Sequence, residues 1–437
     1  MLRFGVFSDT HIGRNVPRIV GDARRQAFRQ AFKQAVNIFI EERVDYILHG
    51  GDLFEKRTMT PEDVAFVKDE FYRLVQASRE KWGKDVKIFI VRGNHDGTPS
   101  SCVLEYITHP LASYLQIIGE SIKEELQYFI DEKILVAGIG YHPFIKSRIK
   151  DQVENLAEIF KSSNDKKLEI LLLHNYVEKI HEIPPYTPEH SIIDIDDLKK
   201  INPDIVVVGH YHERGDVKYK NDIKFIIPGA TEAVDLGEKG PFGVYIIEVK
   251  EGIKMNTKFI ELTPSQHISV RKIVSEEAKP IQWFKERVLD EVSTFIDELN
   301  MRNLPGILKI KVSGKTSDTK AFLRLLTEEE IRKIREENPK LLYLEVEEDI
   351  TPLTREELRE ETVVSREEMF EELYREIGRE PNVLELIEET SLALEEKASE
   401  KTGLLKDSDR SSFVEKWLRI LLDKAGEEMN GNDPSHA

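Results

Sequence analysis

The sequence predicts a layered α/β fold for residues 1–262, followed by a smaller α+β unit and a helical tail. Two observations lead to this prediction. Short β-branched apolar runs alternate with polar turns and helical stretches up to about residue 262, which is the pattern of helices packed on a sheet. The 437 residues, 40% of them hydrophobic, suffice for about three domains at roughly 150 residues each.

The expected strands of the first unit share a short run of Val, Ile, Leu or Phe bounded by polar residues. They are Leu2–Ser8, Tyr46–His49, Lys87–Val91, Ile134–Ile139, Glu169–Leu173, Ile205–Val208, Lys224–Ile227, Phe242–Val249 and Met255–Leu262. Between the first two strands, Ala23–Glu41 repeats apolar residues at helical spacing. A second helix is expected to begin at Pro61, because Glu62 and Asp63 would complement the helix dipole in its first turn.

The second unit is expected to alternate helices with strands around a modest core of its own. Its helices are predicted at Ile281–Leu299 and Thr327–Asn338, and its strands at Gly306–Val312 and Leu341–Val346. Five segments of the chain are therefore expected. They are an α/β domain at 1–265, an α+β unit at 266–348, a charged linker at 349–381, a helix-loop-helix at 382–425 and a disordered tail at 426–437.

The helix-loop-helix contains two amphipathic stretches, Val383–Lys397 and Ser412–Lys424. Two short helices cannot bury so much apolar surface against each other, so a partner protein is expected to cover them. A helical pair that packs on its own domain is the alternative.

The chain carries 81 Asp+Glu against 63 Lys+Arg, a formal net charge of −18. Domains that bind nucleic acid are usually basic, so this total argues against such a partner. The acidity is uneven, however, because residues 351–437 hold 23 acidic and 12 basic residues, which is −11 of the −18. The remaining 350 residues are nearly balanced, and the net charge does not decide whether the protein binds DNA.

A cytoplasmic location is expected from three features of the sequence. The single cysteine, Cys102, excludes an intramolecular disulfide framework and a multi-thiolate zinc site. No apolar run approaches the ~20 residues that cross a bilayer, so no membrane association is expected. The amino terminus lacks the uninterrupted apolar stretch of a signal peptide.

Residue types that bind metals follow five of the expected strands. They are Asp9 and His11 in D-x-H, Asp52 in GGD, Asn94 and His95 in GNHD, His174 after LEILLL, and His210 and His212 in GHYH. The carboxyl ends of strands in an open α/β sheet gather ligands, so these side chains are expected to converge. Carboxylate, imidazole and amide groups suit manganese, iron or zinc, and the set predicts a two-metal hydrolase. Glycines before Asp52, Asn94 and His210 are expected to permit sharp turns.

The ordered motifs SDTHIG, GGDLF, RGNHDG, LLLHN and VGHYH resemble the calcineurin-like metallophosphoesterase superfamily. With the α+β unit and the helical tail, the chain resembles the archaeal type of the meiotic-recombination-eleven nuclease family, whose bacterial relative is SbcD. The resemblance implies a β-sandwich flanked by helices, a small α+β capping domain that helps to hold DNA, and a C-terminal helical tail. It also implies ligand roles: Asp52 bridges two Mn²⁺ ions, or other divalent ions. Asp9, His11 and His212 then bind one ion, Asn94, His174 and His210 bind the other, and His95 is catalytic.

The function implied by this resemblance is manganese-dependent DNA cleavage in double-strand-break repair, as a 3′–5′ exonuclease on duplex ends and an endonuclease on single strands. The protein would be a nucleoid-associated homodimer, with dimer contacts on helices near Pro61–Trp82 and Ser100–Leu115. Its tail helices would grip the coiled coil of an SMC-like ABC ATPase. One departure is Glu55, which replaces a histidine of many family members and is expected to repel phosphate.

Two alternatives to this function remain open at the level of sequence. One is a small-molecule phosphodiesterase or phosphatase of the same superfamily, and the other is a scaffold that bridges two ATPase subunits. Asp96 is expected either to orient His95 or to cap a turn. The remaining histidines of interest, His49, His142, His181 and His190, are expected to be structural or exposed. Basic residues near the metal ligands contact DNA phosphates or remain solvated, and they are Arg14, Arg18, Arg24, Arg25, Lys56 and Arg57.

Overall fold

The computed structural model describes residues 1–120, 126–161, 167–215, 217–220, 223–250, 254–318 and 324–352. The chain divides into two compact units, Met1–Leu353 and Thr354–Ala437, and the description concerns the first. The expected helix-loop-helix at 382–425 and the tail at 426–437 lie outside the described residues, as does the expected linker from residue 353 onward.

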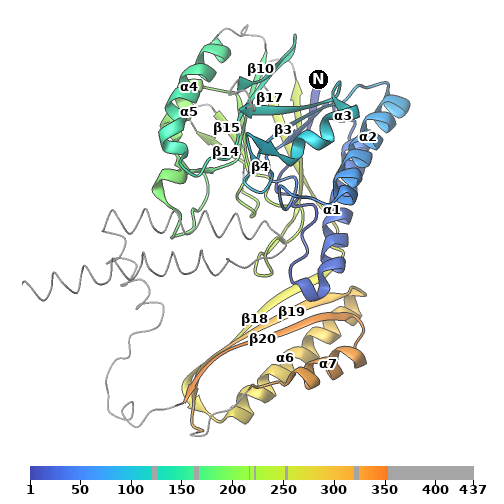
Figure 1. Cartoon of the computed structure of the whole chain (residues 1–437), viewed down its shortest axis with the longest axis vertical. Helices are drawn as coiled ribbons and strands as arrows, with labels where there is room; N and C mark the ends of the chain where they lie inside the picture. The colour runs from blue at the N-terminus through green and yellow to red at the C-terminus, as the bar shows by residue number, and fades with distance from the viewer. Residues whose placement is uncertain are drawn as a thin grey trace, which may run out of the picture. The chain divides into compact units, whose positions relative to one another are not determined.

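Two sheets form the centre of the first unit (Figure 1). The seven-stranded sheet has the order β17 (Lys254–Glu261), β16 (Gly243–Lys250), β1 (Leu2–Phe7), β2 (Tyr46–His49), β3 (Lys87–Val91), β6 (Leu115–Glu120) and β7 (Leu126–Gln127). The six-stranded sheet has the order β14 (Lys218–Lys220), β15 (Ile223–Ile226), β13 (Ile205–Val208), β10 (Leu168–Leu173), β9 (Ile134–Ile139) and β8 (Phe129–Ile130). The central strands β1, β2, β3 and β6 run parallel, and so do β9, β10, β13 and β15.

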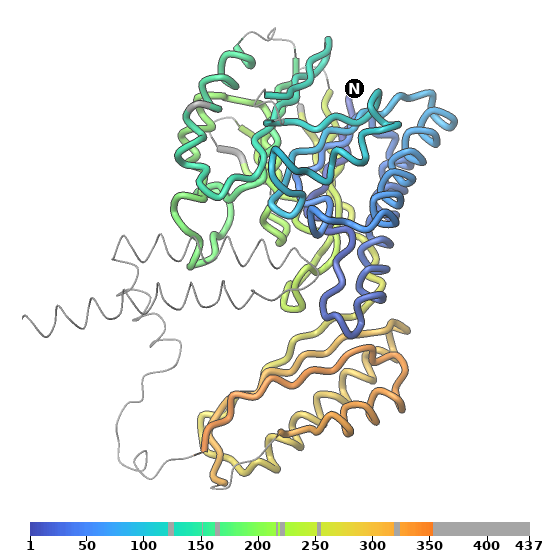
Figure 2. The backbone as a smooth tube through the Cα atoms, viewed as in Figure 1, coloured from blue at the N-terminus to red at the C-terminus, as the bar shows by residue number. Residues whose placement is uncertain are grey.

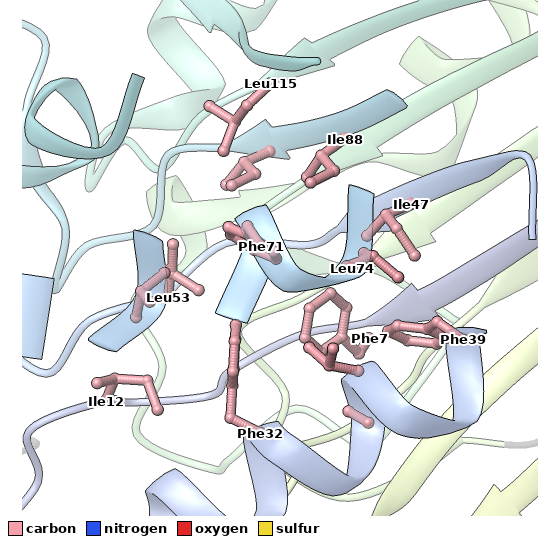
Figure 3. Close-up of a cluster of buried hydrophobic side chains, with 14 of the residues drawn as sticks. Phe7, Ile12, Phe32, Phe39, Ile47, Leu53, Phe71, Leu74, Ile88 and Leu115 are labelled. Carbon is pink, nitrogen blue, oxygen red and sulfur yellow. The ribbon is translucent and has the colours of Figure 1, made fainter. Parts of the chain in front are cut away.

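The two sheets pack face to face, and helices cover their outer faces. Buried residues between the sheets include Phe4, Val6, Leu48, Phe89, Val136, Ile170, Leu172 and Val207. Helices α1 (Gly21–Glu41) and α2 (Pro61–Trp82) cover the first sheet, where Phe39, Phe71 and Leu74 meet Ile47 and Ile88 (Figure 3). On the second sheet, α4 (Ile145–Lys161) and α5 (Ile195–Ile201) play the same part. The expected layered α/β architecture is therefore confirmed.

Helix α2 begins where its sequence predicts. The Thr60 side chain accepts a hydrogen bond from Asp63 N at 3.2 Å, and Pro61 occupies the first helical position. The helix ends at Gly83, which takes the left-handed conformation at φ 62° that glycine tolerates best.

The stretch Ser100–Leu115 is not the continuous helix expected. It contains only η2 (Val103–Ile107) and α3 (Thr108–Leu111), and β6 follows as a strand missed from the sequence. The reason is Pro110, because a residue before proline is driven out of helical geometry, and His109 is extended at φ −100° and ψ 129°. The other short elements are η1 (Arg18–Val20), β4 (Gly97–Thr98), β5 (Ser101–Cys102), β11 (Tyr176–Val177), η3 (Glu189–Ser191) and β12 (Ile192–Ile193).

Residues 267–352 form a three-stranded parallel sheet with two helices packed on it (Figure 2). Its elements are β18 (His267–Lys279), α6 (Ile281–Arg302), β19 (Gly306–Thr316), α7 (Glu328–Glu337) and β20 (Leu341–Pro352). Phe284, Val288 and Phe295 of α6 pack in one buried cluster with Leu308 and Leu344 of the sheet. In the part of the chain that the structure describes, no helix is long and apolar enough to span a membrane.

Candidate metal centre

Five loops converge at the carboxyl ends of parallel strands from both sheets. The loops after β1, β2 and β3 carry Asp9, His11, Asp52, Asn94 and His95, and the loops after β10 and β13 carry His174, His210 and His212. Parallel strands end at the same edge of a sheet, so residues up to 203 positions apart in the sequence meet there. All eight residues expected at the site are brought together.

Potential ligand atoms gather in three groups of three, and one of these groups, His11, Glu55 and His95, shares His11 with another. Asp9, His11 and His212 make up the first triad, and Asp52, His174 and His210 make up the second; within each triad the ligand atoms lie within 4.8 Å of one another.

Asp52 lies between the triads. Its Oδ2 is 3.2 Å from His174 Nε2 and 3.8 Å from His11 Nε2. The amide oxygen of Asn94 is 3.2 Å from His174 Nε2, beside the second triad. An oxygen shared by two ligand groups is the arrangement that a pair of divalent ions requires.

The donor set fits divalent ions for a physical reason. Asp9 and Asp52 are 0% and 1% exposed, and in the described part of the chain neither pairs with a lysine or arginine. Only histidines lie beside these buried carboxylates, and a bound metal would supply the positive charge when the imidazoles are neutral. Among the described residues, His11 Nε2 also finds no hydrogen-bond partner.

The backbone at the site holds unusual conformations. Asp9, His11, Asp52 and His210 have φ values of 50°, 40°, 52° and 77°, in the left-handed region that side chains disfavour. Backbone bonds between loops stabilise them: Asp9 N donates to Gly51 O at 3.0 Å, and His11 N donates to Asp52 O at 3.1 Å. Strain of this kind is characteristic of functional sites.

The glycines before the ligands serve two purposes. Gly51 has φ +100°, which agrees with the expected turn. Gly93 and Gly209 do not need positive φ; they are required because the loops pass too closely. A Cβ on Gly93 would lie 2.1 Å from Asp52 Oδ1, and one on Gly209 would lie 2.2 Å from Gly50 O. The prediction that Gly93 and Gly209 are needed for sharp turns is therefore wrong.

Charge interactions keep Asp52 ionised at neutral pH. Burial by itself raises the pKa of this carboxyl, but the adjacent His174 lowers the pKa well below its usual range. Burial lowers the pKa of His174, yet Asp52 outweighs it and raises the pKa to about 9. For His210, burial and then the charge of His174 lower the pKa to about 3, and they outweigh the opposing charge of Asp52.

Asp96 caps backbone groups and does not contact the imidazole of His95. Its carboxylate accepts hydrogen bonds from Phe54 N at 3.0 Å and Gly93 N at 2.9 Å, which joins the β2 and β3 loops. The half-buried His95 is oriented instead by Glu55, whose carbonyl oxygen accepts from His95 Nδ1 at 2.8 Å. Burial, followed by the charge of Asp52, raises the pKa of Asp96 to about 6.

His49 supports the site from behind, in keeping with the structural role expected for it. Its Nδ1 accepts a hydrogen bond from Gly51 N at 3.2 Å, and its Nε2 lies 3.3 Å from Thr10 Oγ1. The buried imidazole thus ties the Asp9 loop to the Asp52 loop. Burial lowers its pKa to about 3, so it is neutral.

Several basic residues near the site already have partners. Arg24 is fully buried and lies 3.6 Å from Glu232, and Arg14 donates to Glu55 Oε1 at 2.9 Å and to Asp235 Oδ1 at 2.9 Å. The expectation that Arg24 contacts phosphate is therefore wrong. Glu55 is likewise not a free carboxylate, because Arg14 balances its charge. Among the described residues, Arg18, Lys56 and Arg57 form no ion pair and remain available to an anion.

Two carboxylates contact ligand histidines, and no sequence motif indicates these contacts. Glu55 accepts a hydrogen bond from His11 Nδ1 at 3.1 Å, and Glu238 accepts one from His212 Nδ1 at 2.6 Å. Glu238 lies 26 positions beyond its histidine in an irregular loop, so no motif spacing connects the pair. Only the folded chain brings them together.

Comparisons with known proteins agree with this geometry. Residues 2–214, which include all eight candidate residues, match the model of the family described as calcineurin-like phosphoesterase. The chain is 26% identical to the DNA double-strand break repair protein Mre11 of Thermoplasma acidophilum, over 56% of this chain and 62% of that protein. It is 28% identical to the protein of the same name from Saccharolobus solfataricus, over 70% of this chain and 74% of that protein.

Among solved structures, a dimetal phosphatase from Danio rerio aligns with a TM-score of 0.38 and 13% identity, over 59% of this chain and 95% of that chain. The matches span about half to three-fifths of the length of several curated relatives. The region that matches this family model, residues 2–214, contains both triads at the strand ends.

Proposed function

We propose that this protein is a manganese-dependent DNA nuclease that processes DNA ends in double-strand-break repair. The observation that carries the proposal is the position of Asp52 between two ligand triads, at an edge where five loops meet. The relatives named as DNA double-strand break repair proteins support DNA as the substrate. The activities proposed are 3′–5′ exonuclease on duplex ends and endonuclease on single strands.

The ligand roles proposed follow the two triads. Asp9, His11 and His212 hold one Mn²⁺, His174 and His210 with Asn94 hold the other, and Asp52 reaches both. When bound, the ions supply a nucleophile from water at neutral pH and neutralise charge on the phosphoryl group. Because the carboxylates are buried, bulk water does not screen their charge.

His95 is the residue proposed to act on the substrate directly. Its ring lies 4.8 Å from that of His11, centroid to centroid, and the bond from its Nδ1 to the Glu55 carbonyl turns Nε2 away from that carbonyl. From there Nε2 stabilises the transferring phosphoryl or protonates the leaving oxygen. Lys56 and Arg57, which follow Glu55 in the same loop, are proposed to contact flanking phosphates.

The proposed partners are a second copy of this chain and an SMC-like ABC ATPase. Their support is the family resemblance of the motifs and the names of the relatives. The tail proposed to bind the ATPase lies outside the described residues.

The test compares DNA with a generic phosphodiester. The full chain is incubated with MnCl₂ and either end-labelled duplex DNA, circular single-stranded DNA or bis(p-nitrophenyl) phosphate, with and without the ATPase. We expect cleavage of all three by the wild type and none by His95→Ser. Mn²⁺ binding should stay unchanged in this variant, because the triads Asp9, His11, His212 and Asp52, His174, His210 keep all their ligands.

The controls separate the alternatives. Hydrolysis of the generic phosphodiester without DNA cleavage, in both the presence and the absence of the ATPase, would favour a small-molecule phosphodiesterase. Full activity in His95→Ser would remove His95 from the reaction.

A further inference from the structure

The two triads differ in what holds their imidazole rings. In the first triad, His11 Nδ1 donates to Glu55 Oε2 at 3.1 Å and His212 Nδ1 donates to Glu238 Oε1 at 2.6 Å. In the second triad, His174 Nδ1 donates to the backbone oxygen of Gly50 at 2.7 Å. Within the described residues, no glutamate pairs with either histidine of the second triad.

Both glutamates are held in place from their other side. Glu55 is 7% exposed, and its Oε1 accepts from Arg14 Nη1 at 2.9 Å. Glu238 Oε2 accepts from Val234 N at 2.7 Å. Each carboxylate therefore keeps one oxygen directed at its histidine.

Arg14 joins the two supports into one network. While Nη1 binds Glu55, its Nε donates to Val234 O at 2.5 Å and its Nη2 donates to Asp235 Oδ1 at 2.9 Å. Val234 is the residue whose N–H binds Glu238. Hydrogen bonds through Arg14 and the Val234 backbone thus connect the carboxylates behind His11 and His212, although Glu55 and Glu238 are 183 positions apart in the sequence.

We propose that Glu55 and Glu238 are positioning residues that make the first triad the tighter of the two metal positions. A carboxylate that accepts from Nδ1–H fixes the tautomer in which Nε2 carries the lone pair, and it raises the basicity of Nε2. A neutral backbone carbonyl, the partner of His174, is the weaker acceptor of the two. Each triad contains one carboxylate of its own, Asp9 in the first and Asp52 in the second, so the glutamates behind His11 and His212 are what distinguishes the first triad.

The inference rests on the proposed two-metal function and adds the order in which the two metal positions are filled. The first Mn²⁺ occupies the first triad, and the second ion follows at higher concentration. It also assigns a role to Glu55 at a position where many members of the resembled family carry histidine.

The experiment measures metal binding instead of activity. The metal-free full chain is titrated with MnCl₂ by isothermal titration calorimetry, and Mn²⁺ electron paramagnetic resonance follows filling of the sites. For the wild type we expect one tight and one weak ion.

The variants separate charge from hydrogen bonding. Glu55→Gln and Glu238→Gln keep an acceptor but lose the charge, so we expect the tight affinity to fall about 10-fold and the weak one to stay unchanged. Glu55→Ala and Glu238→Ala lose both, and we expect a fall of about 100-fold. If the glutamates were needed only for folding, the glutamine variants would not keep more of the Mn²⁺ affinity than the alanine variants.

The matched control is Glu232→Gln. Glu232 lies on the same loop as Glu238, is 5% exposed and pairs with Arg24, and it touches neither triad. We expect both affinities to be unchanged in this variant, with melting curves recorded for every protein.

Three results would overturn the inference. Two equal Mn²⁺ affinities in the wild type would refute the inference. Glutamine variants that change neither affinity, or both equally, would also refute it. In both cases the proposed function would still stand if the protein cleaves DNA. An equal loss in Glu232→Gln would show that any buried carboxylate of this region has the same effect. A wild type that binds no Mn²⁺ would refute the inference and the proposed function together.

Discussion

Replacing Gly93 by alanine should disturb the centre of the metal site without touching a ligand. An added Cβ would lie 2.1 Å from Asp52 Oδ1 and 2.3 Å from Asp52 N, where ordinary contact begins at 3.4 Å. The obstacle includes backbone, so no side-chain rotation relieves it. The β2 and β3 loops must therefore separate by roughly 1 Å in a close-packed interior.

The size of the effect follows from this displacement. Overpacking of this kind costs about 1–3 kcal/mol of unfolding free energy. Because Asp52 lies between the triads, a displacement of roughly 1 Å should lower phosphodiester hydrolysis by about 100-fold. Backbone strain contributes nothing, since Gly93 does not have positive φ.

The assay combines thermal melting, Mn²⁺ titration and hydrolysis of bis(p-nitrophenyl) phosphate. Gly237→Ala is the control, because a Cβ there meets no atom within 4 Å and Gly237 has no positive φ. If Gly93→Ala melts, binds Mn²⁺ and hydrolyses the substrate as Gly237→Ala does, loop spacing does not set the position of Asp52.

Two further predictions concern buried charges. Arg24→Met leaves the carboxylate of Glu232, which is 5% exposed, without its cation. We therefore expect the free energy of unfolding, measured by chemical denaturation, to fall by about 3–5 kcal/mol. Adding Glu232→Gln to the same chain should restore part of this loss, and no recovery would contradict the pairing. Burial, aided by Lys218, lowers the pKa of His181 to about 4, so between pH 6.5 and 5 the unfolded chain binds the extra proton. The wild type should lose about 1.6 kcal/mol of unfolding free energy over that range, and His181→Phe should not. If the stability of both proteins falls equally with pH, His181 is not the cause.

Local patterns in the sequence were enough to predict the strands that carry the site. The strands expected at Tyr46–His49, Lys87–Val91, Ile134–Ile139 and Ile205–Val208 have those exact bounds in the fold. Each is buried on both faces, so each shows as a mainly apolar run, and all of them except Ile134–Ile139 precede a loop with candidate ligands. The residue types of the metal centre could be predicted for the same reason.

The same local patterns failed where distant contacts decide the conformation. The strand β6 was missed because its place in the sheet depends on pairing with β3, and the segment before it was expected to be one long helix. Arg24 has the charge of a surface residue, and its burial becomes visible only when Glu232, more than 200 positions away, is brought beside it.

By itself, the sequence determined the layered α/β class, the strand ends and the metal-binding residue types, because these depend on hydrophobic periodicity and on neighbours along the chain. Only the tertiary structure decided why Gly93 and Gly209 are glycine and that Glu55 faces His11. The grouping of the ligands was available from the sequence only through the family resemblance, and the structure brings the groups together. The tertiary structure also decided that Glu238 supports His212. These features depend on distances between loops that are remote in sequence, and such distances exist only once the two sheets have packed.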